Sequence, residues 1–291
     1  MSEKVEIIKQ LSQKHDVKLL CRLLKLPRST YYAALNRKPS KRSLENQGIM
    51  DNISVIYEGS KKRYGCIKIK YALEKYGIHI SQNRVLRLMR KMKIRSIICR
   101  KYRQRSRSVD NVERQNLIKR QFHADKPNKI WLTDITYVWT TRNGWTYLAV
   151  VLDLCTKKAV GYGYSKNMTA QLATEALMNA CKKQGFPKDV TLHSDQGSQY
   201  TSELFIQTAL RLNMRLSYSA KGCPIDNSPM ESFNAIFKKE EVYLNTYTDF
   251  DDAKLKIFDF IEGFYNRNRI HSSINFMTPT EFESSFFDTV I

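Results

Sequence analysis

The sequence lacks the cysteine pairs and the long apolar runs that mark zinc proteins, disulfide-stabilised proteins and membrane proteins. Its six cysteines are scattered with no C-x-x-C pair, and no pair of histidines lies near them at zinc-ligand spacing. No apolar stretch reaches the roughly 18 residues of a membrane span, and MSEKVEIIKQ has no apolar core after its charges. We therefore expect no structural zinc, no membrane partner, and free thiols in a reducing cytoplasm.

Acidic residues are scarce in the first 125 positions. Lys and Arg number 31 there against 10 Asp and Glu, so the whole net charge of +21 lies in this half, whereas the rest has 18 of each sign. Such a charge excess favours nucleic acid as the partner, because neutralising phosphates releases counterions. A solubilising or ribosome-type basic surface is the alternative. A neutral half joined to a basic half suggests an enzyme delivered by a DNA-binding module.

Three short helices are predicted in residues 1–39. Val5, Ile8 and Leu11 have helical spacing, and Ser29 can cap the third helix after Pro27. The order matches a helix-turn-helix, although a small helical bundle that binds protein fits the periodicity equally well. In a helix-turn-helix the side chains facing DNA would be those of Tyr31, Tyr32, Asn36 and Arg37.

A second helical DNA-binding unit is predicted over residues 40–96. One helix ends at Gly77, and the next, QNRVLRLMRKMKI, has an apolar face and a cationic face. No acid occurs between Glu74 and Asp110, so phosphate contact is favoured over an ordinary solvated face. The cationic residues are Arg84, Arg87, Arg90 and Lys91. Residues 97–125 are predicted to be a basic linker that tracks DNA.

Residues 126–245 have the alternating strand and helix patterns of an α/β domain. Three runs rich in β-branched and aromatic residues predict an antiparallel meander, and a helix, a strand, a second helix and a further strand follow. This order predicts a mixed sheet covered by helices, as in ribonuclease H-like folds. Residues 246–291 form a predicted C-terminal helical extension.

Three acids in this domain are predicted to meet at one edge of the sheet. Asp134 lies inside the first strand, where an unpartnered carboxylate is costly. Asp195 ends another strand just before Gly197, and Glu231 lies in the first turns of a helix. Carboxylates without His or Cys ligands suit two Mg²⁺ or Mn²⁺ ions, which support in-line phosphodiester transfer.

Several motifs in order resemble one family. They are RSTYY (28–32), RYG (63–65), NRVLRLM (83–89), PNKIWLTDITY (127–137), HSDQGSQY (193–200), DNSPMESF (226–233) and FYNRNRIHSSINFMTPTEF (264–282). With them the chain resembles the OrfB-type transposases of bacterial insertion sequences, whose DDE catalytic core is similar to retroviral integrase. The front end lacks the His-His-Cys-Cys zinc unit of retroviral integrases, which favours the insertion-sequence resemblance.

The resemblance implies a ribonuclease H-like fold in which Asp134, Asp195 and Glu231 are the catalytic, metal-binding residues. It implies that the enzyme cleaves the ends of an element and joins them to new DNA, and the RYG motif adds Arg63 and Tyr64 to the DNA-binding residues. The implied partners are double-stranded DNA, both terminal inverted repeats and target DNA, further copies of the chain, and an upstream-frame protein. The implied location is the cytoplasm, at the nucleoid.

For other polar residues near the trio the sequence predicts roles other than catalysis. Lys238 lies seven residues after Glu231 on the same helical face and is predicted to contact DNA phosphate. Asn227 is expected to orient the helix that carries Glu231, and Asp226 to cap it. His193 is expected to hydrogen-bond or pack rather than react. Asp153 is interpreted as a turn acid, and the roles of Arg267, Arg269 and His271 stay open between DNA contact and sealing the C-terminal segment.

Two alternatives to a transposase remain. One is a DNA-binding regulator derived from a transposase, and the intact trio disfavours it. The other is a ribonuclease H-type nuclease acting on hybrids, which has no need of two helical DNA-reading units.

Overall fold

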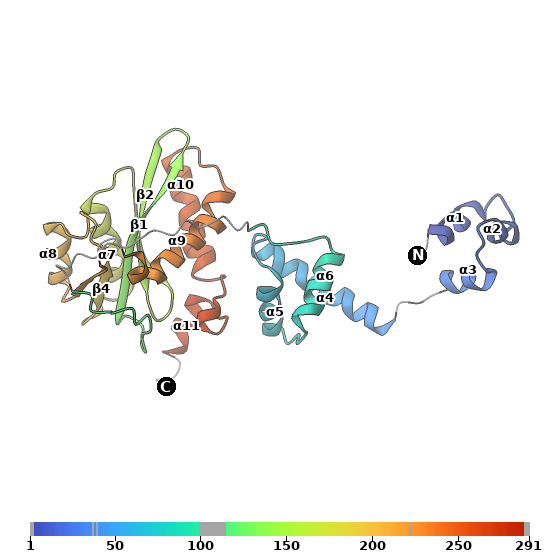
Figure 1. Cartoon of the computed structure of the whole chain (residues 1–291), viewed down its shortest axis with the longest axis horizontal. Coiled ribbons are helices and arrows are strands. Elements are labelled where there is room, and N and C mark those ends of the chain that lie inside the picture. The colour runs from blue at the N-terminus through green and yellow to red at the C-terminus, as the bar shows by residue number, and fades with distance from the viewer. Residues whose placement is uncertain (1–2, 37, 39, 99–114, 221–222, 288–291) are drawn as a thin grey trace.

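The computed structural model of the chain describes residues 3–36, 38, 40–98, 115–220 and 223–287. Figure 1 shows two helical bodies followed by an α/β core. Within these ranges no helix is long and apolar enough to cross a membrane. The predicted DNA contact Arg37 and most of the predicted linker lie outside the described residues.

The first body contains the three predicted helices, α1 (Glu3–Leu11), α2 (Val17–Leu23) and α3 (Arg28–Leu35). Its small core includes Tyr31, which is only 3% exposed. The prediction that Tyr31 faces DNA is therefore wrong, because this ring fills the space between the helices. Tyr32 is 43% exposed. The cap of α3 also differs from the prediction, since Pro27 and not Ser29 occupies the N-cap position and the helix begins two residues earlier, at Arg28.

The second body consists of α4 (Lys41–Gly59), α5 (Cys66–Lys75) and α6 (Gln82–Lys91). The last two helices were predicted, whereas α4 was not. Its first half is exposed and has no apolar face; buried residues begin only at Ile49. Ser40 caps this helix by accepting a hydrogen bond from the N–H of Ser43. The polar stretch at 41–48 is thus a solvated extension of a packed helix.

The core is built on a mixed five-stranded sheet of the ribonuclease H-like type. The meander consists of β1 (Ile130–Thr140), β2 (Gly144–Asp153) and β3 (Ala159–Ser165), which pair antiparallel. Next to β1 lie β4 (Thr191–Ser194) and β5 (Arg215–Tyr218), both parallel to it, in the order β3-β2-β1-β4-β5. The meander and the alternating strands that follow it confirm the prediction.

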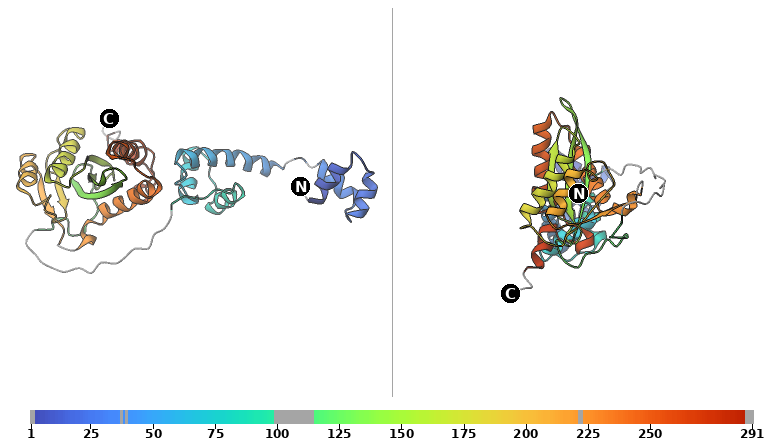
Figure 2. Two further views of the ribbon diagram at one scale, coloured as in Figure 1. Left: turned by 90° about the horizontal axis from the view of Figure 1, so that it is seen from above. Right: turned by 90° about the vertical axis from the view of Figure 1, so that its left-hand side faces the viewer.

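Helices cover both faces of the sheet (Figure 2). One layer contains α7 (Ala170–Lys183) and α8 (Glu203–Arg211). A Cβ at Gly161 would stand 2.4 Å from the backbone of α7, so glycine is needed for this close packing. The opposite layer contains α9 (Ser228–Glu240), α10 (Phe250–Phe258), the π-helical turn η3 (Asp259–Tyr265) and α11 (Pro279–Ser285).

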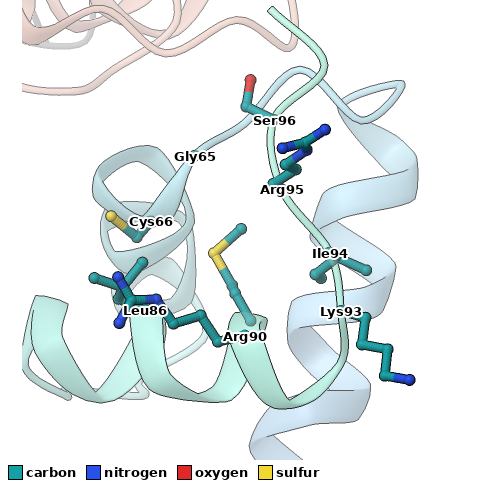
Figure 3. Close-up of a pocket in the computed structure, with 9 residues that line it drawn as sticks. Gly65, Cys66, Leu86, Arg90, Lys93, Ile94, Arg95 and Ser96 are labelled. Atoms are coloured by element: carbon teal, nitrogen blue, oxygen red, sulfur yellow. The ribbon is translucent and has the colours of Figure 1, made fainter.

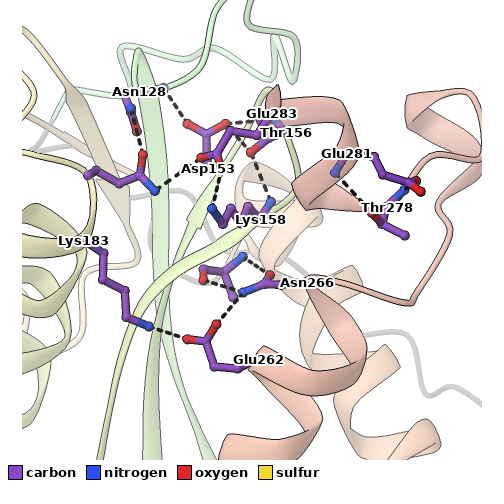
Figure 4. A network of polar contacts seen from close by, with 12 residues as sticks. Asn128, Asp153, Thr156, Lys158, Lys183, Glu262, Asn266, Thr278, Glu281 and Glu283 are labelled. Carbon is purple, nitrogen blue, oxygen red and sulfur yellow. Dashed lines mark hydrogen bonds and ion pairs between the residues drawn. The ribbon is translucent and has the colours of Figure 1, made fainter. Parts of the chain in front are cut away.

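A polar network fastens the C-terminal helices to the meander (Figure 4). Asp153 accepts hydrogen bonds from the backbone N–H groups of Thr156 (2.8 Å) and Asn128 (2.7 Å), which agrees with the turn acid that the sequence predicted. Lys158 bonds Glu283, and the side chain of Asn266 pairs with the backbone of β3. The C-terminal extension is therefore part of the core.

The second helical body docks on this C-terminal layer. Arg63 is 5% exposed; its Nε donates to the carbonyl of Glu240 (2.6 Å) and its Nη2 to Glu241 (2.9 Å). Its guanidinium also lies 4.3 Å from the ring centroid of Phe264. Tyr64 is 4% exposed and hydrogen-bonds the backbone of the C-terminal segment. The prediction that Arg63 and Tyr64 contact DNA is wrong for this structure, because both side chains are buried between the two bodies.

The described end of the predicted linker also packs on the core. The N–H of Leu117 donates to Ser217 Oγ (2.9 Å), and the carbonyl of Gln115 accepts from Tyr218. Ile118 is 4% exposed in the apolar core. Residues 115–118 are therefore attached to the core, whereas most side chains of residues 115–125 are exposed, and the prediction that this segment tracks DNA stays a prediction.

We expect Arg63→Ala to lower the free energy of unfolding by about 3–5 kcal/mol, because it leaves the carboxylate of Glu241 buried without its cation. Urea denaturation followed by tryptophan fluorescence measures this loss, since all three tryptophans lie on β1 and β2 of the α/β domain. Arg87→Ala, which removes an exposed arginine from α6, is the matched control and should change stability by less than about 0.5 kcal/mol. Equal losses in the two variants would contradict the docking contact.

Candidate active site

Asp134 lies in the middle of β1, opposite Val150 of β2. Its side chain is partly buried. One carboxylate oxygen accepts a hydrogen bond from the N–H of Ile135 (2.8 Å), and the other accepts from Asn234 Nδ2 of α9 (2.8 Å). The carboxylate is therefore held between a strand and a helix, with its orientation determined by both.

The pKa of Asp134 is raised to about 7. Burial is the largest cause, the negative charge of Asp195 comes next, and Glu231 adds a smaller effect in the same direction. The hydrogen bonds from Ile135 and Asn234 oppose this shift. Asp195 and Glu231, both far from Asp134 in the sequence, thus lie near enough to act on its carboxylate, and a bound cation would offset their effect.

Asp195 follows β4 directly, and its side chain is exposed. Its Oδ1 accepts a hydrogen bond from the N–H of Gly197 (3.0 Å). A Cβ at Gly197 would stand 3.0 Å from that same oxygen, so the glycine leaves the carboxylate room to turn. Since β4 pairs with β1 only as far as Leu132, Asp195 emerges where the edge of β1 becomes open to Asp134.

Glu231 lies in the first turn of α9, as predicted, and Asn234 is one turn further on. The helix start is attached to β1 because Asn227 Nδ2 donates to the carbonyl of Thr133 (3.4 Å). Asn227 therefore orients the helix, as expected, although its side chain does not cap it. The Oδ1 atoms of Asn227 and Asn234 are buried without a hydrogen-bond partner.

The donor set fits a hard divalent cation better than zinc. The acids around Asp134 offer carboxylate oxygens, which Mg²⁺ and Mn²⁺ prefer. The unpaired Oδ1 of Asn234 is a further oxygen beside them. Among the described residues, however, no three His, Cys, Asp or Glu side chains are grouped closely enough to hold a metal ion as they stand.

Lys238 lies on α9 two turns beyond Glu231, and its ammonium group lies 4.0 Å from the ring centroid of Tyr137 in β1. The helix thus carries an acid, an amide and a cation along one side, all next to the same strand. This position is compatible with the predicted phosphate contact, which stays a prediction.

The predicted DNA-binding side chains of α6 differ in their surroundings. Arg84 pairs with Glu45 (2.9 Å) and hydrogen-bonds Asn46, so it joins α6 to α4. The other three cations, Arg87, Arg90 and Lys91, are exposed. A cavity of about 480 Å³ next to α6 is lined by Arg90 together with Lys93 and Arg95 from the segment that follows (Figure 3).

Two other candidate residues have structural roles. His193 is fully buried, and its ring nitrogens hydrogen-bond Ser217 (2.8 Å) and Ser219 (3.0 Å), in keeping with the expected supporting role. Asp226 accepts from Arg120 Nε (2.6 Å) and from the N–H of Ala220 (3.0 Å). The prediction that Asp226 caps the following helix is wrong, because its carboxylate instead anchors the loop before α9.

For two residues of the FYNRNRIHSS motif, the structure decides between DNA contact and sealing of the C-terminal segment. Arg269 forms two hydrogen bonds with Glu240 (2.9 and 2.8 Å) and is 7% exposed. His271 is buried beside it, and burial together with the charge of Arg269 lowers the pKa of His271 to about 2. Both residues seal the C-terminal segment on α9, whereas Arg267 is exposed.

Asn234 is the functional residue that the sequence reasoning missed. The signal was present, since Asn234 follows Glu231 by three residues and so lies on the same helical face. An amide in a helix is nevertheless common, and only the structure places it within 2.8 Å of Asp134.

Comparisons with known proteins identify the family of this chain. Residues 124–224 and 212–279 match models of the integrase core domain, and residues 43–102 match an HTH-like domain. The transposase for insertion sequence element IS904 of Lactococcus lactis is 36% identical over 86% of this chain and 98% of its own length. Transposase InsF for insertion sequence IS3A of Escherichia coli K12 is 33% identical over 97% of this chain and 98% of its own length. The HTLV-2 integrase catalytic core, solved in complex with magnesium, covers 55% of this chain with a TM-score of 0.42 and 17% identity; 98% of that chain is aligned.

A ribonuclease H-like sheet with an integrase core domain defines an enzyme of the DDE transposase and integrase class. The matches to its relatives extend through the helical bodies as well as the core. The chain therefore belongs to the family of insertion-sequence transposases.

We expect Asn234→Ala to weaken divalent-metal activation of DNA cleavage about 10–100-fold, because Asp134 would lose the donor that orients it. A titration of cleavage rate against Mn²⁺ concentration measures the shift. Asn179→Ala is a matched control, since it also removes one amide hydrogen bond, to Tyr162, but from α7 in the opposite layer. If Asn234→Ala and wild type share one activation midpoint, Asn234 does not position the acid.

Proposed function

We propose that Asp134, Asp195 and Glu231 together hold two Mg²⁺ ions and catalyse cleavage of the ends of an insertion sequence and their transfer to target DNA. The observation that carries the proposal is the attachment of α9 to β1 beside Asp134: Asn234, one turn after Glu231, donates to the Asp134 carboxylate, and Asn227 bonds the carbonyl before it. Burial and the nearby charges of Asp195 and Glu231 raise the pKa of Asp134. Acids arranged so that they repel one another in a folded protein are typical of sites that bind cations.

Each residue of the trio has a distinct part in the proposal. Asp134 is fixed by Asn234 and provides an oriented ligand between strand and helix. Asp195 reaches the site from an exposed turn, and Glu231 from a helix whose start is attached to β1 through Asn227. Mg²⁺ held by these three carboxylates would supply Lewis-acid chemistry for phosphodiester cleavage and transfer. Lys238 contacts a DNA phosphate near the scissile bond.

The helical bodies bring DNA to this site. The exposed side chains of Arg87, Arg90 and Lys91 bind phosphates of the terminal inverted repeats, and the first body adds contacts through the surface of α3. Joining two ends requires at least two copies of the chain on DNA, and an upstream-frame protein is a further partner. The enzyme acts in the cytoplasm, at the nucleoid.

We expect Asp134→Asn, Asp195→Asn and Glu231→Gln each to reduce metal-dependent cleavage of a labelled terminal-repeat duplex at least about 100-fold. Each change removes a charged ligand while keeping the size of the side chain. Duplex binding, measured by anisotropy without divalent metal, should stay at the wild-type value. A variant that still cleaves at the wild-type rate would remove its residue from the site. Cleavage of a DNA–RNA hybrid in preference to duplex DNA would instead indicate a ribonuclease H-type nuclease.

We expect the triple variant Arg87→Ala/Arg90→Ala/Lys91→Ala to flatten the salt dependence of duplex binding. Each lost phosphate contact lowers the slope of log K against log[salt] by about 0.9, so three contacts lower it by roughly 2.7. The matched control is Lys182→Ala/Lys188→Ala/Arg211→Ala, which removes the same charge from exposed positions on or next to α7 and α8. Equal slopes in the two triple variants would show that α6 acts only through net charge.

A further inference from the structure

Three aromatic side chains are exposed together on one face of the hairpin formed by β1 and β2. Tyr137 is 52% exposed, and Trp139 and Trp145 are each 51% exposed. The ring centroids of Tyr137 and Trp145 are 5.0 Å apart, and those of Trp139 and Trp145 are 5.1 Å apart, both in edge-to-face contact. We call these three rings the aromatic platform.

The platform lies on a rigid support. Trp139 and Trp145 are register partners across the hairpin. The turn between the strands is fastened to the segment before α10, because the N–H groups of Thr141 and Arg142 donate to the carbonyls of Tyr247 and Thr248 (both 2.9 Å). In Figure 1 the hairpin lies beside α10. The rings are therefore presented by fixed strands and not by a loop.

The opposite face of the same hairpin is fully covered. Val138, Thr140 and Thr146 are each 0% exposed, and Phe250 of α10 stacks on Tyr164 of β3 close by. The platform is thus the solvent side of a hairpin whose other side is well packed. Three large rings side by side in water are unfavourable, so this surface is suited to binding something apolar and flat.

The platform is connected to the active site through Lys238. Tyr137 follows Asp134 by three residues, an odd number, so the two side chains point to opposite faces of β1, roughly 10 Å apart along the strand at about 3.3 Å per residue. Lys238, whose ammonium group lies over Tyr137, is on the helix that carries Glu231 and Asn234, and Asn234 bonds Asp134. A DNA strand that passes from the trio around the edge of β1 would meet this cation and then the aromatic rings.

We infer that the aromatic platform stacks on unpaired bases of the DNA strand whose phosphodiester bond lies at the trio, while Lys238 neutralises the phosphate between them. Bases have flat aromatic faces, but in a duplex neighbouring pairs cover those faces, so the rings stack only on bases freed from pairing. The cation at the platform favours a nucleic acid over a second copy of this chain as the occupant. The inference rests on the proposed function, because the trio must hold that strand.

Binding of two duplexes of one terminal-repeat sequence tests the platform. One duplex is fully paired, and the other has its last three base pairs mismatched so that the end is splayed. Without divalent metal, we expect the wild-type chain to bind the splayed duplex at least about 5-fold more tightly. Tryptophan emission should fall on binding the splayed end, because Trp139 and Trp145 are exposed whereas the third tryptophan, Trp131, is 0% exposed.

Variants test whether the tryptophan rings of the platform cause the preference for the splayed duplex. The variant Trp139→Ala/Trp145→Ala should bind the paired and the splayed duplex equally, with the affinity that the wild-type chain has for the paired duplex. The variant Trp139→Phe/Trp145→Phe should keep most of the preference for the splayed duplex. The emission of Trp131 reports that the core remains folded. Phe258→Ala, which removes a 53% exposed ring from α10, is the matched control and should keep the full preference.

Two outcomes would overturn the inference. One is a wild-type chain that binds both duplexes equally, and the other is a double alanine variant that keeps the preference. If that variant keeps the preference but loses self-association in sedimentation, the platform is a contact between copies. Because these measurements involve no cleavage, they are independent of the trio. Asp195→Asn should keep the preference while losing cleavage, whereas an Asp195→Asn variant that cleaves would refute the proposed function and not the platform.

Discussion

The electrostatic repulsion around Asp134 is the constraint on which the arrangement of the site depends. A carboxylate in the middle of a strand is costly to bury, and here two further acids raise the cost. The chain compensates with hydrogen bonds from Ile135 and Asn234, and the second of these attaches α9 to β1. The contact that makes the buried acid tolerable is therefore also the contact that positions the helix carrying Glu231.

The two ends of α9 have different partners. Near its start are Glu231 and Asn234, beside the sheet, and at its end Glu240 and Glu241 meet the arginines of two other segments. Nine residues separate Glu231 from Glu240, which is roughly 14 Å of helix. The helix that carries Glu231 is therefore also the element on which Arg63 of the second helical body docks.

Much of this arrangement is predictable from local sequence signals. The meander and the alternating strands that follow depend on residue periodicity and turn residues, which act over short distances. The same holds for the placement of one acid within a strand, one just after a strand and one in the first turn of a helix. The predictions failed where a residue's environment is created by distant segments. Arg63 has the charge of a DNA contact, yet residues almost 180 positions away bury it. Tyr31 is a further case, because its burial depends on packing that no local pattern reveals.

The docking of the second helical body shows that the basic and neutral halves of the chain are joined by a packed contact surface. Arg63 and Tyr64 fill a surface of the core that Phe264 and Glu241 help to form, and Tyr71 stacks on Phe276 at a centroid distance of 3.5 Å. The second helical body and the core thus share one buried contact surface. An unrelated DNA-reading unit put in place of residues 40–96 would leave Glu241 without its arginine and Phe276 without its stacking partner, so the two halves of this chain are not freely exchangeable modules.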